Sequence, residues 1–168
     1  DEQLHLLRIK WNEQKEAIAK TCFDTSEKPC LCMDGWHAYT LDYSSDRLKE
    51  DRRYFDTAGK PMSIPEHKSH RELVEWSEDR SQKMTSYFGP DGAPCVDAEG
   101  VHQYQRRIEN GHITRAAFFD VKGQPHYFGQ FCTWEKKYND QGQCTQTRWL
   151  DEDDEPALNS SGVHIQTT

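Results

Sequence analysis

The sequence lacks long hydrophobic runs. No stretch of 18 consecutive apolar residues occurs, so no transmembrane segment is expected, and the N-terminus lacks the apolar core of a signal peptide. Only 34% of the 168 residues are hydrophobic, which is little for a globular core. The 5 Trp, 7 Tyr and 7 Phe compensate, because each aromatic side chain can bury about 150–250 Å². This composition favours a thin, aromatic-rich sheet.

Excess positive charge is also lacking. The chain carries 21 Lys and Arg against 29 Asp and Glu, for a net charge of −8 at pH 7. Proteins that bind nucleic acid draw most of their affinity from basic side chains that neutralise phosphate. Neither nucleic acid nor an anionic membrane surface is therefore an expected partner.

Cysteine is sparse, and catalytic motifs are missing. The six cysteines are too few for a disulfide scaffold, and their spacing matches no zinc-ribbon or finger pattern. No G-x-S-x-G, H-E-x-x-H or phosphate-loop motif occurs. We therefore predict a protein that is not an enzyme and that needs no cofactor.

What the chain does contain is a repeat of about 32 residues. The same frame, a pair of residues of which at least one is aromatic, followed by Asp or Gly and then by a proline seven residues after the start, begins at Cys22, Tyr54, Tyr87, Phe118 and Trp149. A period of this size indicates one supersecondary unit used several times. We predict a single repeat domain over 1–168, with a half unit at 1–21, full units at 22–53, 54–86, 87–117 and 118–148, and a half unit at 149–168.

Each unit is predicted to be a β-hairpin with a connector. One segment alternates apolar and polar side chains with period two, as in His37, Tyr39, Leu41 and Tyr43, which is typical of a strand with one packed face. A tight turn and the aromatic frame follow. The expected fold is all-β, an antiparallel meander of hairpins forming an open twisted sheet or a β-solenoid.

The segment 63–80 has two interpretations. Its composition, with Ser63-Ile64-Pro65-Glu66 as a start signal, favours one short helix. The repeat alignment instead predicts a strand there, and we favour the strand because neighbouring units override local propensity.

A column of histidines is the sharpest chemical feature. The equivalent positions hold His5, His37, His70, His102, Cys132 and His164. Histidine and cysteine bind metals, so a metal-responsive or pH-responsive element is one hypothesis. The other is that each imidazole closes the apolar face and donates to a neighbouring backbone carbonyl. We favour the second, because equivalent side chains should lie about 9–10 Å apart.

Other residues outside the core columns have weaker interpretations. Trp36, Tyr127, Phe128 and Phe131 could bind a ligand by stacking, or could cap the connectors. The frame aspartates Asp24, Asp56, Asp120 and Asp151 are predicted to form Asx turns. The acidic run 151–155 could bind calcium, but it lacks the EF-hand spacing and is better explained as a solvated turn. Cys30 and Cys95 share one repeat position and are interpreted as small buried residues, with a disulfide as the alternative.

The units resemble bacterial tandem repeats of the form Y-F-D-x-x-G-x-P followed by G-[VWY]-H. The residues that carry the resemblance run from Tyr87-Phe88-Gly89 through Cys95 to Gly100-Val101-His102, and from Cys22-Phe23-Asp24 to Gly35-Trp36-His37. More distantly, the units are similar to the YD repeats of Rhs and Tc toxin shells and to the aromatic hairpins of cell-wall-binding modules. Glu27 and Asp154 depart from the pattern by replacing the turn glycine, which predicts altered turns.

The resemblance implies architecture and binding, with no catalytic residues. We expect a non-catalytic binding or scaffold module of a bacterial envelope or secreted protein, engaging a protein or a glycan. Periplasmic, cell-surface or secreted locations are favoured over the cytoplasm. Self-association through the terminal half-repeats is a further expectation.

Overall fold

The computed structural model describes residues 6–65 and 67–167, and these form an all-β protein. The strands are β1 (Leu6–Trp11), β2 (Ala17–Phe23), β3 (Ala38–Tyr43), β4 (Lys49–Phe55), β5 (Arg71–Trp76), β6 (Gln82–Phe88), β7 (Gln103–Glu109), β8 (His112–Phe119), β9 (Thr133–Tyr138), β10 (Cys144–Leu150) and β11 (Ile165–Thr167).

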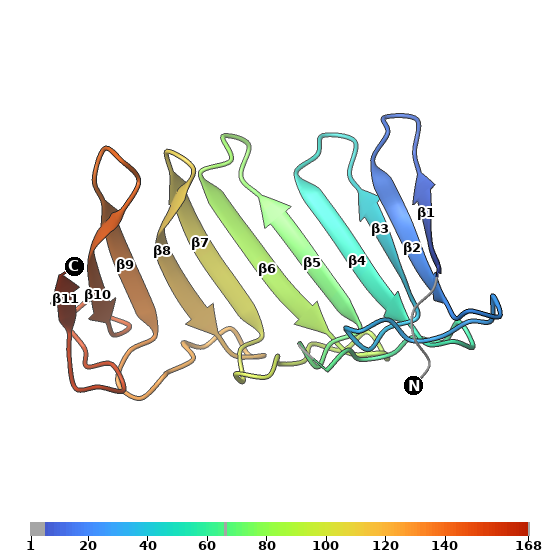
Figure 1. The fold of residues 1–168 in the computed structure, drawn as a ribbon. Coiled ribbons are helices and arrows are strands. Elements are labelled where there is room, and N and C mark those ends of the chain that lie inside the picture. The colour runs from blue at the N-terminus through green and yellow to red at the C-terminus, as the bar shows by residue number, and fades with distance from the viewer. Residues whose placement is uncertain (1–5, 66, 168) are drawn as a thin grey trace. The chain divides into compact units, whose positions relative to one another are not determined.

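The strands follow one another in sequence order in a single antiparallel meander, from β1 to β11 (Figure 1). In the described part of the chain the sheet is not closed into a ring, which confirms the predicted open meander. The alternative of a short helix over 63–80 is wrong, because Arg71–Trp76 forms β5 and no helix lies among residues 63–65 and 67–80. Its ladder to β4 supplies the tertiary pairing that outweighs local helix propensity.

The chain divides into two compact units. Unit 1 contains Asp1–Glu75 and Ser86–Glu99, and unit 2 contains Trp76–Thr85 and Gly100–Thr168. Within each unit the turns that close the hairpins lie at one end of the strands, and the longer connectors lie at the other (Figure 1).

The core of unit 1 lies where the connectors fold back over the sheet. Cys22, Cys30, Trp36, Tyr54 and Ile64 form one buried cluster. The strand residues of this cluster, Cys22 and Tyr54, are the first residues of their repeat frames, and the others come from connectors. The sheet is therefore packed at its connector end.

The five repeat frames have the same backbone geometry. An isolated bridge joins the second frame residue to the proline six residues later in every case, namely Phe23–Pro29, Phe55–Pro61, Phe88–Pro94, Phe119–Pro125 and Leu150–Pro156. Tyr54, Tyr87 and Phe118 are buried to nearly the same degree, with 5%, 5% and 6% of each residue exposed. The backbone carbonyl of the first residue of each frame also accepts a hydrogen bond from the amide eight residues later.

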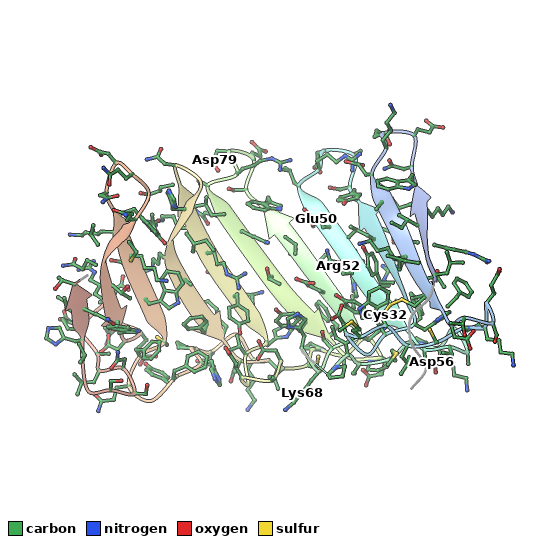
Figure 2. All side chains as sticks on the ribbon, in the orientation of Figure 1. Cys32, Glu50, Arg52, Asp56, Lys68 and Asp79 are labelled. Atoms are coloured by element: carbon green, nitrogen blue, oxygen red, sulfur yellow. A yellow bond between two sulfur atoms is a disulfide. The ribbon has the colours of Figure 1, made fainter. Side chains whose placement is uncertain are left out.

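The Asx turns predicted for the frame aspartates are confirmed. Oδ1 of Asp56 accepts hydrogen bonds from the amides of Ala58 and Lys60 at 2.9 and 2.8 Å, and Figure 2 shows Asp56 at the connector end of the strands. The same pair of bonds forms at Asp24, Asp120 and Asp151.

The turns without glycine keep this geometry. Glu27 and Asp154 adopt φ values of 57° and 64°, close to the 74° of Gly59 at the equivalent position. The expected alteration of these turns is therefore wrong, because the Asx hydrogen bonds hold the chain in the left-handed region despite the side chain.

Glu27→Gly should therefore stabilise unit 1 by about 0.5 kcal/mol, because glycine removes the left-handed penalty, and part of the gain is offset by its greater freedom when unfolded. The ion pair lost with Arg8 is solvent-exposed and contributes little. Urea unfolding measures the change. Gly59→Ala is the converse control, and equal stabilities for both variants and the wild type would contradict the argument.

A disulfide joins Cys22 of β2 to Cys32 of the following connector, with the Cα atoms 5.8 Å apart. Figure 2 shows Cys32 at the connector end of unit 1. The sequence analysis did not predict this bridge. Cys30 is buried beside it, as expected for a small apolar residue, while Cys95 is only partly buried.

Candidate functional site

The histidine column makes contacts with the backbone. Nδ1 of His37 lies 2.9 Å from the carbonyl oxygen of Cys30, and Nδ1 of His70 lies 2.6 Å from that of Tyr54. Because a carbonyl oxygen only accepts hydrogen bonds, Nδ1 must carry the proton in both rings. Both side chains are buried. These two contacts are the ones predicted by the interpretation of the column as structural.

Residues 6–65 and 67–167 contain no group of three or more His, Cys, Asp or Glu side chains that could hold a metal ion. The backbone amide of His102 donates a hydrogen bond to the carbonyl of Phe119. Cys132 is buried, and the amide of Trp149 bonds to the carbonyl of His164. His5 lies outside the described residues.

His70→Ala is expected to lower the free energy of unfolding by about 1–2 kcal/mol, because it leaves the carbonyl of Tyr54 with one buried partner fewer. Thermal unfolding with and without zinc measures this. Zinc should shift neither the wild type nor the variant, and a zinc-dependent rise that the variant loses would restore the metal hypothesis. His164→Ala, at an exposed equivalent position, is the matched control.

The four aromatic residues proposed for ligand stacking have different surroundings. Trp36 is only 8% exposed and belongs to the core of unit 1, so its ring is not accessible to a ligand. Phe128 and Phe131 stack on each other with centroids 5.7 Å apart and are half-buried over the connector of unit 2. Tyr127 is the most accessible, at 39%.

Two clefts open between neighbouring hairpins, one in each unit. They arise because the adjacent strands of two neighbouring hairpins pair over fewer residues than the two strands of one hairpin do. β2 pairs with β3 over three residues, and β8 pairs with β9 over three, whereas within the hairpins β3 pairs with β4 over six and β7 with β8 over seven. Beyond the short ladders the strands diverge toward the hairpin turns, and a cleft lies between them.

The cleft in unit 1, here the Tyr43 cleft, has a volume of about 540 Å³. Tyr43 lies at the end of β3, and the guanidinium of Arg47 covers its ring at 4.7 Å. Arg47 also pairs with Glu16 of the neighbouring hairpin at 2.5 Å. Ile18, Leu41 and Asp42 complete the lining.

The cleft in unit 2, here the Tyr138 cleft, has a volume of about 760 Å³. Both volumes lie in the range of about 300–1,000 Å³ that is usual for small-molecule sites. The ring of His112 stacks on Tyr138 with centroids 4.5 Å apart, and the hydroxyl of Tyr138 donates to the carbonyl of Ile113 at 3.1 Å. This ring pair forms a wall that joins the two hairpins.

The two clefts use equivalent positions of the repeat. Tyr43 and Tyr138 are both the fourth residue of the alternating column, six positions after His37 and Cys132 respectively. Burial raises the pKa of both phenols above the ordinary value. Both hydroxyls therefore stay protonated at neutral pH, and that of Tyr138 donates its proton to the carbonyl of Ile113.

Glu135 is the electrostatic centre of the Tyr138 cleft. Its carboxylate accepts a hydrogen bond from Nη1 of Arg115 at 2.7 Å and from Nε of Arg148 at 2.7 Å. Partial burial opposes ionisation, but the two arginines outweigh it and hold the pKa of Glu135 below its usual value. Glu135 is therefore ionised at neutral pH and orients both guanidinium groups.

This arrangement predicts a pH dependence. Because the pKa of Glu135 is lowered by folding, its stabilising contribution is complete above the unfolded value near 4.5 and is lost as the pH falls through the lowered folded value. Urea unfolding of the wild type and of Glu135→Gln should show a stability difference at pH 7 that shrinks below pH 4. A difference that does not change with pH would contradict the assignment.

Sequence reasoning did not identify these clefts. Tyr43 and Tyr138 were assigned to the packed face, and the sequence carries no signal for how far two hairpins pair. The signal that was available is the change of side-chain type at the fourth column position, where Tyr43 and Tyr138 are replaced by Trp11, Trp76 and Ile108 in the other copies.

The fold and the clefts together define an all-β meander of hairpins with polar clefts between them. No protein-family model matches the chain, and no curated protein is significantly similar to it. The described residues contain no helix long and apolar enough to cross a membrane.

Proposed function

We propose that the chain is a non-catalytic binding module, built of tandem β-hairpin repeats and belonging to a bacterial envelope or secreted protein, whose clefts between neighbouring hairpins bind a protein or glycan ligand. One observation carries the proposal. A cleft of ligand size opens at the same repeat position in each unit, beside Tyr43 and beside Tyr138.

The meander does not require these openings. β4 and β5 pair over five residues, so the same architecture can join two hairpins more closely. At the two clefts the ladder stops after three residues and leaves strand backbone beyond it unpaired between hairpins, which gives up stabilising hydrogen bonds. Such openings are expected where they serve recognition.

The chemistry of the cleft groups supports binding over catalysis. A general acid or base needs a pKa near the working pH. Glu135 has a lowered pKa, and Tyr43 and Tyr138 have raised ones, so none of these groups exchanges protons readily at neutral pH. These groups can instead hold a polar ligand with fixed donors and acceptors.

The disulfide supports the extracytoplasmic part of the proposal. Structural disulfides persist in oxidising compartments and are rare in the cytosol. The Cys22–Cys32 bridge is therefore in keeping with a periplasmic, cell-surface or secreted location.

A two-dimensional amide NMR titration tests the proposal. The probes are a neutral chitin oligosaccharide, an acidic hyaluronan oligosaccharide and an unstructured peptide. At least one should shift amides lining the Tyr43 or the Tyr138 cleft, and Tyr43→Ala or Tyr138→Ala should abolish the shifts at its own cleft. Trp11→Ala, an exposed aromatic outside both clefts, is the control. Conversion of a probe into product, or shifts confined to other surfaces, would contradict the proposal.

A further inference from the structure

The two units differ in how they neutralise a pair of facing arginines. In unit 1, Arg53 of β4 lies directly opposite Arg71 of β5. Asp51 bridges them, with its carboxylate 2.5 Å from Arg53 and 2.8 Å from Arg71. Like charges directly opposite in a sheet are destabilising, and the shared carboxylate removes this repulsion.

Unit 2 has another pair of facing arginines, within one hairpin, without a shared carboxylate. Arg107 of β7 lies directly opposite Arg115 of β8. Arg115 pairs with Glu135 and with Asp154. Among the described residues, no carboxylate lies within ion-pair distance of Arg107, which is exposed at the rim of the Tyr138 cleft.

Other cations add to this imbalance. Lys137 also lines the cleft, is exposed, and makes no ion pair with a described residue, and Arg148 shares Glu135 with Arg115. Lining cations number five, namely Arg107, Arg115, Lys136, Lys137 and Arg148, against three acids, namely Glu109, Glu135 and Asp140. Asp154, outside this lining, pairs with Arg115, so the excess is one positive charge in a chain whose net charge is −8.

The cleft also holds an unused hydrogen-bonding group. The hydroxyl oxygen of Thr114 is covered and has no hydrogen-bond partner, although a buried polar atom normally has one. Thr114 lies beside Arg115 on β8 and lines the same cleft.

We propose that the Tyr138 cleft binds an anionic group, a carboxylate or a phosphate, which takes between Arg107 and Arg115 the place that Asp51 takes between Arg53 and Arg71. This inference rests on the proposed function and specifies the chemistry of one of its two clefts. Arginine suits this role because its planar fork binds carboxylate and phosphate oxygens in pairs. Lys137 adds charge at the rim, and Glu135 keeps Arg115 and Arg148 in position.

The position of Tyr138 favours a small ligand in this cleft over an inserted peptide strand. An inserted peptide strand would need the free backbone acceptors of β8, but the carbonyl of Ile113 already accepts the hydroxyl of Tyr138. The stacked His112 ring covers the space beside it. The cleft therefore fits a small acid or an acidic group of a larger ligand better than an added strand.

Amide NMR titrations at constant ionic strength test the inference, with glucuronate as the carboxylate probe, inorganic phosphate as the phosphate probe and glucose as the neutral control. One of the anions should shift amides around Arg107, Arg115 and Lys137, and glucose should not. Arg107→Gln should weaken that binding at least tenfold, and Lys137→Gln should weaken it by a smaller factor. The tighter of the two anions identifies the group recognised.

Lys122→Gln is the matched control, because it removes the same charge from an exposed turn of unit 2 outside the cleft, and it should leave binding unchanged. A second readout is stability without ligand. Arg107→Gln should not lower the melting temperature, since it relieves the repulsion with Arg115, whereas a purely structural arginine would lower it.

Several results would overturn the anion site. These are a response to glucose equal to that of the anions, unchanged affinity in Arg107→Gln, equal weakening by Lys122→Gln, or no response of the cleft amides to either anion. The binding module proposed above is judged separately by its oligosaccharide and peptide probes and by the Tyr43 cleft, which lacks the facing arginine pair.

Discussion

Trp36→Ala is expected to lower the free energy of unfolding of unit 1 by about 3–5 kcal/mol, because it removes a large buried aromatic side chain and leaves a cavity. Trp36 packs against Tyr39 and Tyr54, with ring centroids 5.1 and 6.5 Å away, and lies in the same cluster as Cys22 and Ile64. Natural domains are stable by only about 5–15 kcal/mol. The variant should therefore lose a large part of its stability, which urea unfolding followed by circular dichroism measures.

Trp11→Ala provides the matched control in the same unit. Trp11 lies on β1 and is 57% exposed, so the same substitution should change stability by no more than about 0.5 kcal/mol. Trp36→Phe keeps most of the ring and should lie between the wild type and the alanine variant, and it remains measurable if Trp36→Ala does not fold. Equal losses at Trp11 and Trp36 would contradict the placement of Trp36 in the core.

The hairpin architecture could be predicted because local and tertiary signals agree at the frames. The proline six residues after Phe23, Phe55, Phe88 or Phe119 bridges back to it in each case, and the aspartate that follows Phe23, Phe55 and Phe119 supplies an Asx turn. Even the segment around Arg71–Trp76, with its helical composition, forms a strand, because its neighbours in the ladder outweigh propensity.

The clefts could not be predicted, because they depend on the length of pairing between hairpins. Period-two alternation places Tyr43 and Tyr138 on one face, but it contains no information on where β2 leaves β3 or where β8 leaves β9. Where two neighbouring strands diverge depends on residues that are distant in sequence from the repeat frame. The columns of equivalent residues therefore predict where the strands lie, but they do not predict where clefts open between them.

The two pairs of facing arginines show that one hairpin architecture can carry different charge arrangements. Arg53 and Arg71, on strands that join two hairpins, share Asp51, whereas Arg107 and Arg115 face each other within the β7–β8 hairpin of unit 2 with no shared acid. The packed frame residues need not change for this to happen, because the arginines lie on the half-exposed part of the strands. One architecture can thus hold an internally neutralised pair in one place and an incomplete one in another.

Removing the Cys22–Cys32 disulfide is expected to lower the free energy of unfolding of unit 1 by about 2–3 kcal/mol. The bridge closes a loop between residues ten positions apart, and the loss of loop closure frees the unfolded chain by about this amount. The loop contains the Asx turn at Asp24 and the buried Cys30, so the bridge holds this connector against β2. Urea unfolding of the oxidised wild type and of the double variant Cys22→Ser with Cys32→Ser measures the difference.

The double variant is preferred because a single substitution would leave Cys30 beside one remaining partner, and the two could form a different bridge. Cys144→Ser, which changes a half-buried thiol outside the bridge, is the control and should have a small effect. Reductant should bring the wild type close to the double variant and leave the variant itself unchanged. If reductant instead leaves the stability of the wild type unchanged, the bridge makes no contribution, and its support for an oxidising compartment is lost with it.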